Sequence, residues 1–126
     1  MIRRAFRTTF RTAFRMAFFG AALSSTLAAA AYPERPVRLI VPYPPGGPTD
    51  LIGRAVNEGL GKRLGQQVVV DNRGGAASVV GADIAARSPA DGYTLLVATA
   101  TTLAVNPALN DKLPYHPVKD FTPVRM

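Results

Sequence analysis

Residues 37–50 read VRLIVPYPPGGPTD, and the fold expected for the chain follows from this stretch. Val37 to Val41 is a short run of β-branched and apolar residues that Pro42 ends, a pattern typical of a buried strand. The next segment, Pro42 to Asp50, holds four prolines and two glycines, so it should form a loop of fixed shape. The sequence therefore predicts a strand followed by a rigid loop.

The segment after this loop predicts an amphipathic helix. From Leu51 to Leu64, apolar residues recur with i, i+3, i+4 spacing. Thr49 or Asp50 is the expected N-cap, and Gly65 the expected end of the helix. We expect Asp50 to cap the helix and shape the loop rather than to touch an anionic ligand, because its carboxylate would repel the ligand.

Further strands and helices follow along the chain. Gln67 to Val70 and Tyr93 to Ala98 are predicted strands, and Val79 to Arg87 is a predicted helix. Asn106 to Leu109 can open a short helix, whereas the proline-rich residues 113–126 indicate an extended connection. Because the strands are apolar throughout rather than alternating, the β-α-β-α-β order predicts an α/β fold with a parallel sheet covered by helices.

Residues 1–31 predict a secretory signal peptide. Five arginines and no acidic residue come first, followed by the apolar stretch Met16–Leu27 and the small residues Ala28–Ala31. A membrane-spanning helix is the alternative, but the apolar stretch is interrupted by polar residues and is shorter than the ~20 residues that spanning needs. We expect cleavage near Ala30 or Ala31 and a periplasmic product, with the secretory and twin-arginine routes both open.

Removal of this segment would change the charge of the protein. The whole sequence carries 15 Lys and Arg against 8 Asp and Glu, a formal net charge of +7. Five of the basic residues lie in the signal segment, and the others are dispersed and form no stripe interleaved with aromatics, which argues against nucleic acid as a partner. Cysteine is absent, which excludes disulfides, thiolate metal sites and a lipid anchor on an N-terminal cysteine.

Three loops at the carboxyl ends of the predicted strands form the candidate binding region. They span residues 44–50, 72–78 and 99–106, and all are rich in Gly, Ser, Thr or Asn. In an open parallel sheet, ligands bind beyond these ends, where backbone amides and helix dipoles favour a carboxylate or phosphate. The prolines around Gly46 and Gly47 restrict the first loop in advance, which lowers the ordering cost of binding. A simple tight turn is the alternative interpretation of these glycines.

Motifs for catalysis are lacking in these loops. They contain neither the Gly-Lys-Ser/Thr of a phosphate loop nor the G-x-G-x-x-G of a dinucleotide fold, and no cofactor is expected. Ser78 lacks the flanking glycines of a nucleophile elbow, so we expect it to cap the second helix. His116 is the only histidine and lies among prolines, where we expect a solvated side chain and no metal site. A small exported enzyme acting on anionic substrates would need a titratable pair near the strand ends, where only Asp50 and Asp71 lie.

The sequence from Tyr32 to Val124 resembles the tripartite tricarboxylate transporter receptors, also called Bug proteins. The resemblance rests on the order and spacing of the segments YPERPVRLIVPYPPGGPTD, LGQQVVVDNRGGA, PADGYTLLVAT, NPAL and LPYHPVKDFTPV. It implies the two-domain, type II periplasmic binding protein fold, which closes like a hinged clamp on a di- or tricarboxylate or an amino acid. It also implies a passive receptor rather than an enzyme, with membrane transporter subunits as partners; we expect a monomer.

By this resemblance, residues 43–50 and 99–106 should line the ligand cleft. Backbone amides, hydroxyls and ordered water would then hold the ligand carboxylates. Together with the strand-end argument, this gives the candidate ligand-binding residues Tyr43, Pro44, Gly46, Gly47, Thr49, Asp50, Ala76, Ser78, Thr99, Thr101 and Asn106.

The chain departs from the family pattern in three places. The family usually shows Asn-Arg-Pro-Gly-Ala-Gly-Gly where residues 72–78 read NRGGAAS. If those positions need positive φ, Ala77 and Ser78 would cost stability or narrow the cleft. An aspartate is common where His116 stands. Members run to roughly 300 residues, so we expect residues 32–126 to be an incomplete N-terminal lobe, with a nonfunctional fragment of a receptor as the alternative.

Overall fold

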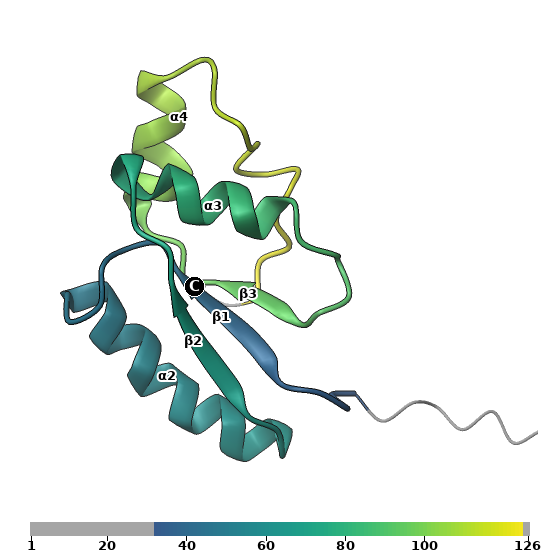
Figure 1. The fold of residues 1–126 in the computed structure, drawn as a ribbon. Helices are drawn as coiled ribbons and strands as arrows, with labels where there is room; N and C mark the ends of the chain where they lie inside the picture. Colours follow the sequence, from purple (N-terminus) through teal and green to yellow (C-terminus); the bar gives the residue numbers. More distant parts are fainter. Residues whose placement is uncertain (1–31, 125–126) are drawn as a thin grey trace, which may run out of the picture. The chain divides into compact units, whose positions relative to one another are not determined.

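The computed structural model describes residues 32–124, so the signal-peptide prediction lies outside the described residues. The described part is an α/β unit built on a parallel sheet (Figure 1). Its elements are β1 (Val37–Val41), α2 (Pro48–Leu64), β2 (Val68–Asn72), a 3-10 turn (Ala76–Ser78), α3 (Val79–Ala86), β3 (Thr94–Leu96), a π-helical turn (Thr101–Val105) and α4 (Asn106–Leu109). None of the helices among residues 32–124 is long and apolar enough to cross a membrane.

The sheet places its first strand in the centre. The strand order is β2-β1-β3, and both pairings are parallel. Val37 pairs with Val68 on one side, and Arg38 pairs with Thr94 on the other. The α/β fold class and the parallel sheet predicted from the sequence are therefore confirmed, and the carboxyl ends of all three strands lie at one edge.

Helix α2 covers one face of the sheet. Val37, Leu39 and Val68 are buried there and pack with Leu60 and Leu64 of the helix. The helix also comes close to the end of β1, because a Cβ built on Gly53 would lie 2.9 Å from Val41 Cγ2. A glycine that weakens the helix in isolation thus permits the packing that holds the helix in place.

Helix α3 covers the opposite face only near the carboxyl ends of the strands. Gly81 of α3 touches the end of β1, since a Cβ built on it would lie 2.6 Å from Pro42 Cβ and 2.7 Å from the Arg73 carbonyl oxygen. The same face carries Arg38, Val69 and Asp71 further along the sheet, because side chains alternate between faces along each strand.

The residues that precede β1 are fastened to the turn before β3. The Tyr32 hydroxyl donates to the Gly92 carbonyl (2.7 Å), and the Tyr32 and Tyr93 rings pack edge to face. Arg35 lies over the Tyr93 ring and pairs with Asp91 (2.7 Å). Residues 32–36 therefore form no helix or strand but are bound to the rest of the unit.

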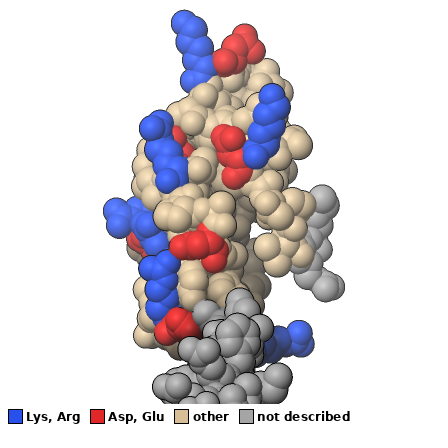
Figure 2. Space-filling model, turned by 90° about the vertical axis from the view of Figure 1, so that its right-hand side faces the viewer, with Lys and Arg blue, Asp and Glu red and all other residues tan. Residues whose placement is uncertain are grey.

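Basic and acidic side chains are mixed on the surface in Figure 2. Among the described residues, Arg87 pairs with Asp83 and Arg35 pairs with Asp91. Several basic groups follow one another down the left-hand side of this view, with acidic groups beside them, so the charge on this face is mixed.

The structure corrects several predicted boundaries. Helix α2 begins at Pro48 with Gly47 as N-cap, so neither Thr49 nor Asp50 is the N-cap; proline suits the first helical position because its missing N–H has no partner there anyway. Strand β2 runs on to Asn72, since the Arg73 amide still donates to the Val41 carbonyl (2.8 Å).

The other corrections concern residues 93–109. Strand β3 is only Thr94–Leu96, shorter than the predicted Tyr93–Ala98. The polar segment after it is helical at Thr101–Val105 and runs directly into the predicted short helix at Asn106–Leu109. The third loop is therefore a compact helical turn rather than an open loop.

Candidate functional site

A buried carboxylate organises the first loop. Asp50 is 2% exposed and accepts hydrogen bonds from the Gly46 amide (2.8 Å), Arg54 Nε (2.9 Å) and Asn72 Nδ2 (2.9 Å). These partners, led by Arg54, lower the pKa of Asp50 to about 2, so the group stays ionised. The expectation that Asp50 shapes the loop is confirmed, although it does so by binding Gly46 and Asn72 and not as the N-cap.

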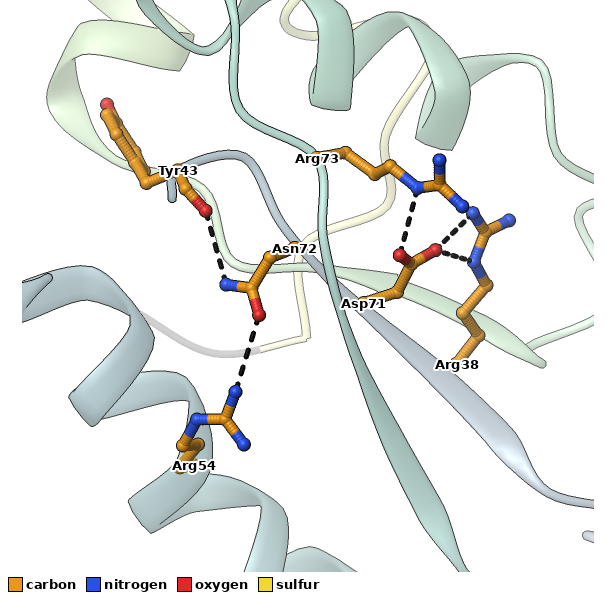
Figure 3. Close-up of polar contacts among 6 residues, drawn as sticks. All are labelled: Arg38, Tyr43, Arg54, Asp71, Asn72 and Arg73. Carbon is orange, nitrogen blue, oxygen red and sulfur yellow. Dashed lines mark hydrogen bonds and ion pairs between the residues drawn. The ribbon is translucent and has the colours of Figure 1, made fainter. Parts of the chain in front are cut away.

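Asn72 joins the first loop to the end of β2. Its Nδ2 also donates to the Tyr43 carbonyl (3.2 Å), and its Oδ1 accepts from Arg54 Nη2 (3.4 Å), as Figure 3 shows. The second loop also touches the first, because a Cβ built on Gly74 would lie 3.1 Å from the ring of Pro44. Asn72 and Arg54 were not among the predicted site residues, because nothing in their spacing marks them.

The second loop contains a left-handed turn made of residues other than glycine. Ala76, Ala77 and Ser78 have φ values of 44°, 51° and 78°. Left-handed backbone costs an L-residue roughly 1–2 kcal/mol. Positions 77 and 78, where the family usually has glycine, do have positive φ in this chain, so Ala77 and Ser78 should cost stability there.

Side chains of the third segment hold this strained turn. Asn106 Nδ2 donates to the Ala77 carbonyl (2.8 Å) and to Ser78 Oγ (3.3 Å). Ser78 Oγ also shares a hydrogen bond with Thr102 Oγ1 (2.9 Å). Ser78 is the N-cap residue of α3, as predicted, but its side chain makes no capping hydrogen bond: at φ 78° its hydroxyl is bonded to the third segment instead.

A chain of hydroxyls continues from Ser78 to the first loop. Thr102 is fully buried and lies 3.2 Å from Thr99 Oγ1, which in turn lies 2.9 Å from the Tyr43 hydroxyl. The Tyr115 hydroxyl donates to the Thr102 carbonyl (2.6 Å). Burial raises the pKa of Tyr43, but hydrogen bonds with Thr99 and neighbouring hydroxyls outweigh burial and hold the pKa below its usual value.

The predicted site residues therefore lie at one edge, in two groups. Tyr43, Ser78, Thr99 and Asn106 are connected by the hydrogen bonds above, and Thr101 lies half-buried beside them. The rest lie on the first loop and turn: Pro44, Gly46 and Ala76 are exposed, Gly47 and Thr49 are half-buried, and Asp50 is buried. Sequence reasoning missed Thr102 and Tyr115, although Thr102 belongs to a polar run that it noted.

The acidic residues near the strand ends are all engaged. Asp50 is held by Arg54, and Asp71 accepts from Arg38 and Arg73. Burial raises the pKa of Asp71, but the two guanidinium groups outweigh it and hold the pKa below its usual value. Neither carboxylate is free to act as an acid or base, which argues against the enzyme alternative.

His116 has a structural role in the described chain. Its Nδ1 accepts from the Val118 and Lys119 amides (3.2 Å each), and its own amide donates to Asp120 (2.6 Å). The side chain thus closes a turn rather than being merely solvated as expected. Within residues 32–124, no group of three or more His, Cys, Asp or Glu side chains could hold a metal ion.

Comparison with known sequences identifies the family. The model of the tripartite tricarboxylate transporter family receptor matches residues 52–126. Protein BugT of Bordetella pertussis is 46% identical over 107 residues, which are 84% of this chain and 33% of BugT. A protein from the tcbD-tcbE intergenic region of a Pseudomonas species is 40% identical over 111 residues, 83% of this chain and 33% of that protein. The chain spans about a third of the length of these relatives.

Solved structures of relatives have the same architecture. MatC from Rhodopseudomonas palustris, with bound malate, matches with a TM-score of 0.71 at 41% identity, over 74% of this chain and 32% of MatC. An R. palustris protein with adipate matches with a TM-score of 0.70 at 40% identity, over 74% and 31% of the two chains. The periplasmic binding protein BugD matches with a TM-score of 0.60 at 41% identity, also over 74% and 31%. The fold, the match to the family model over more than half of the sequence and these relatives agree, and the chain belongs to the tripartite tricarboxylate transporter receptor family, a family of receptors rather than enzymes.

Proposed function

We propose that residues 32–124 form one wall of the ligand cleft of a periplasmic receptor for a small carboxylate. The observation that carries this proposal is the joining of all three strand-end loops by Tyr43, Thr99, Thr102, Ser78 and Asn106. A set of loops fixed in advance binds with a smaller loss of conformational freedom.

The chemistry of the edge suits an anion. No side chain of the described residues caps the first turn of α2, so its amides are not taken up by a capping group, and the helix dipole favours negative charge there. Asp50 does not oppose this because Arg54 neutralises it from the side (2.9 Å). Malate and adipate, the molecules in the related structures, are both carboxylates, which supports the same class of ligand here.

The wider setting follows from the family. We propose that residues 1–31 are a signal peptide cleaved near Ala30 or Ala31, and that the mature receptor works as a monomer in the periplasm. A second lobe would supply the other wall of the cleft, and membrane subunits of the transporter would receive the ligand. Residues 32–126 are then an incomplete lobe, and they should bind carboxylates weakly or not at all on their own.

Site-resolved NMR with adipate tests this proposal. At concentrations well above micromolar, adipate should shift the amide signals of Gly47, Thr49 and Asp50 and of residues 99–102, whereas adipamide, which has the same carbon chain without charge, should leave them in place. The variant Thr101→Val should reduce the shifts, while Thr122→Val, the same change outside the three strand-end loops, should not. Equal shifts with the neutral diamide would contradict the proposal.

Calorimetry tests whether the proposed second lobe is needed for tight binding. The isolated chain should give no measurable heat with adipate or malate at micromolar concentrations. Micromolar affinity would show that a single lobe suffices and would overturn the assignment of this unit as half of a clamp.

A further inference from the structure

Two arginines meet over one carboxylate on the sheet face opposite α2. Arg38 Nε donates to Asp71 Oδ2 (2.7 Å), with Arg38 Nη2 on the same oxygen, while Arg73 Nε donates to Asp71 Oδ1 (2.9 Å). Figure 3 shows the two guanidinium groups converging above Asp71, away from the Asn72 side of the strand. Asp71 therefore brings two cationic groups together that would otherwise repel each other.

This cluster carries more positive charge than its own carboxylate can balance. Two guanidinium groups face one carboxylate, and although burial raises the pKa of Asp71, the two arginines outweigh burial and keep the carboxylate ionised. Among the described residues, Arg73 Nη1 and Nη2 and Arg38 Nη1 have no hydrogen-bond partner. The side chains of Arg38 and Arg73 are 38% and 51% exposed, so these donors can be reached from solution.

A cavity adjoins the cluster. Its volume is about 390 Å³, and apart from the three charged residues it is lined by Pro36, by Val69, and by the backbone of Val37 and Val70, whose side chains face α2. Helix α3 covers only the other end of this face, where Gly81 meets Pro42, and Val69 is left 44% exposed. Volume, apolar walls and a few convergent polar groups are what small-molecule sites share.

We propose that this cavity is a second ligand site, which takes the carboxylate of a small acid with an apolar chain. The carboxylate would bridge Arg38 and Arg73, whose planar donor groups match its geometry, and the chain would lie along Val69. The exposed Val69 side chain and Pro36 favour such an acid over inorganic phosphate, which has no apolar group to place against them. Arg73 belongs to the second strand-end loop, but its guanidinium group turns toward Arg38 and Asp71 and away from Asn72, while Arg54 at the same edge is bound to Asp50.

NMR of the arginine side chains tests the site directly with hexanoate as the probe. Hexanoate should shift the Nε–H signals of Arg38 and Arg73 with a saturable dependence on concentration, whereas hexanamide and sodium chloride at equal ionic strength should not. Arg73→Gln should weaken the affinity about tenfold or more, the effect of losing a charge-assisted hydrogen bond. Arg73→Lys keeps the charge without the fork and should fall between that variant and the natural chain.

Arg87→Gln is the matched control, because it removes an exposed arginine that also pairs with an aspartate. It should leave hexanoate binding unchanged. An equal loss in both Arg→Gln variants, or shifts that sodium chloride reproduces, would reduce the cluster to an ordinary surface ion-pair network and overturn the proposal. Shifts confined to residues 99–102 would overturn it too, while supporting the carboxylate site at the strand edge.

Discussion

Replacing Gly81 with alanine should destabilise the unit at the point where α3 meets the sheet. The new Cβ would lie 2.6 Å from Pro42 Cβ, 2.7 Å from the Arg73 carbonyl oxygen and 2.8 Å from Pro42 Cα. All three distances are well below the optimal contact distance of about 3.5–4.0 Å between carbon atoms. The atoms it meets belong to backbone and a proline ring, and Arg73 is held by the hydrogen bond that its amide donates to the Val41 carbonyl (2.8 Å).

The magnitude follows from two opposing effects. Overpacking costs typically 1–3 kcal/mol, and we expect roughly the upper end because neither neighbour can turn away. Alanine in a helix offsets about 1 kcal/mol of this relative to glycine. The free energy of unfolding should therefore fall by about 2 kcal/mol, which corresponds to a melting temperature lower by about 8–16 °C.

Gly59→Ala is the matched control for this prediction. Gly59 lies in the exposed part of α2, and a Cβ built on it has no neighbouring atom within 4 Å. Only the helix-propensity gain remains there, so this variant should be more stable than the natural chain by about 1 kcal/mol. Urea unfolding followed by circular dichroism measures both variants. A Gly81→Ala variant as stable as the natural chain would refute the close packing of α3 on Pro42 and Arg73.

Three further changes test the strand edge. The pKa of Asp50 is lowered to about 2 from an ordinary 3.8, so its contribution to the free energy of unfolding is present above about pH 4 and is lost as the pH falls toward 2. In Asp50→Asn, the free energy of unfolding should therefore vary less with pH in this range, and the variation that remains should be the part due to Asp71. Ala77→Gly should raise the free energy of unfolding by about 0.5–1 kcal/mol, since relief of the left-handed strain exceeds the flexibility of glycine, and no gain in urea unfolding would contradict the strain. Thr102→Val should cost about 1–3 kcal/mol in the same assay because it leaves buried partners unsatisfied, whereas Thr102→Ser should cost less; equal losses would assign the effect to packing instead of the hydroxyl.

The strands and the main helix could be predicted because their signals are local. The apolar run Val37–Val41 and the i, i+3, i+4 spacing after it depend only on near neighbours, and both appear in the structure. The start of α2 was misplaced because Pro48 was counted with the loop prolines, although proline also suits the first turn of a helix. The predicted range for β3 was too long because the strand ends where its pairing with β1 ends, at Leu96, and pairing is not visible in a sequence.

The connections within the site could not be predicted, because they join residues far apart in the chain. Asn106 was proposed as a ligand contact, yet its amide nitrogen is used to hold Ala77 and Ser78. Asn72 and Arg54 escaped notice because their importance comes from Asp50, which binds both. One feature of the site could be predicted from a local pattern. Ala77 and Ser78 stand where the family usually has glycine, and the structure has a left-handed backbone at both positions.

The central place of β1 in the sheet has a consequence for how the protein must assemble. The strand that is synthesised first stays without partners until Val68 and then Thr94 have been made, so every pairing depends on closing a long stretch of chain. A C-terminal truncation that removes β3 would still leave β1 paired with β2. An N-terminal truncation beyond Val37 would shorten β1, the central strand with which both β2 and β3 pair. The short link from Tyr32 to Pro36 is thus the boundary up to which an N-terminal segment can be removed without dismantling the unit.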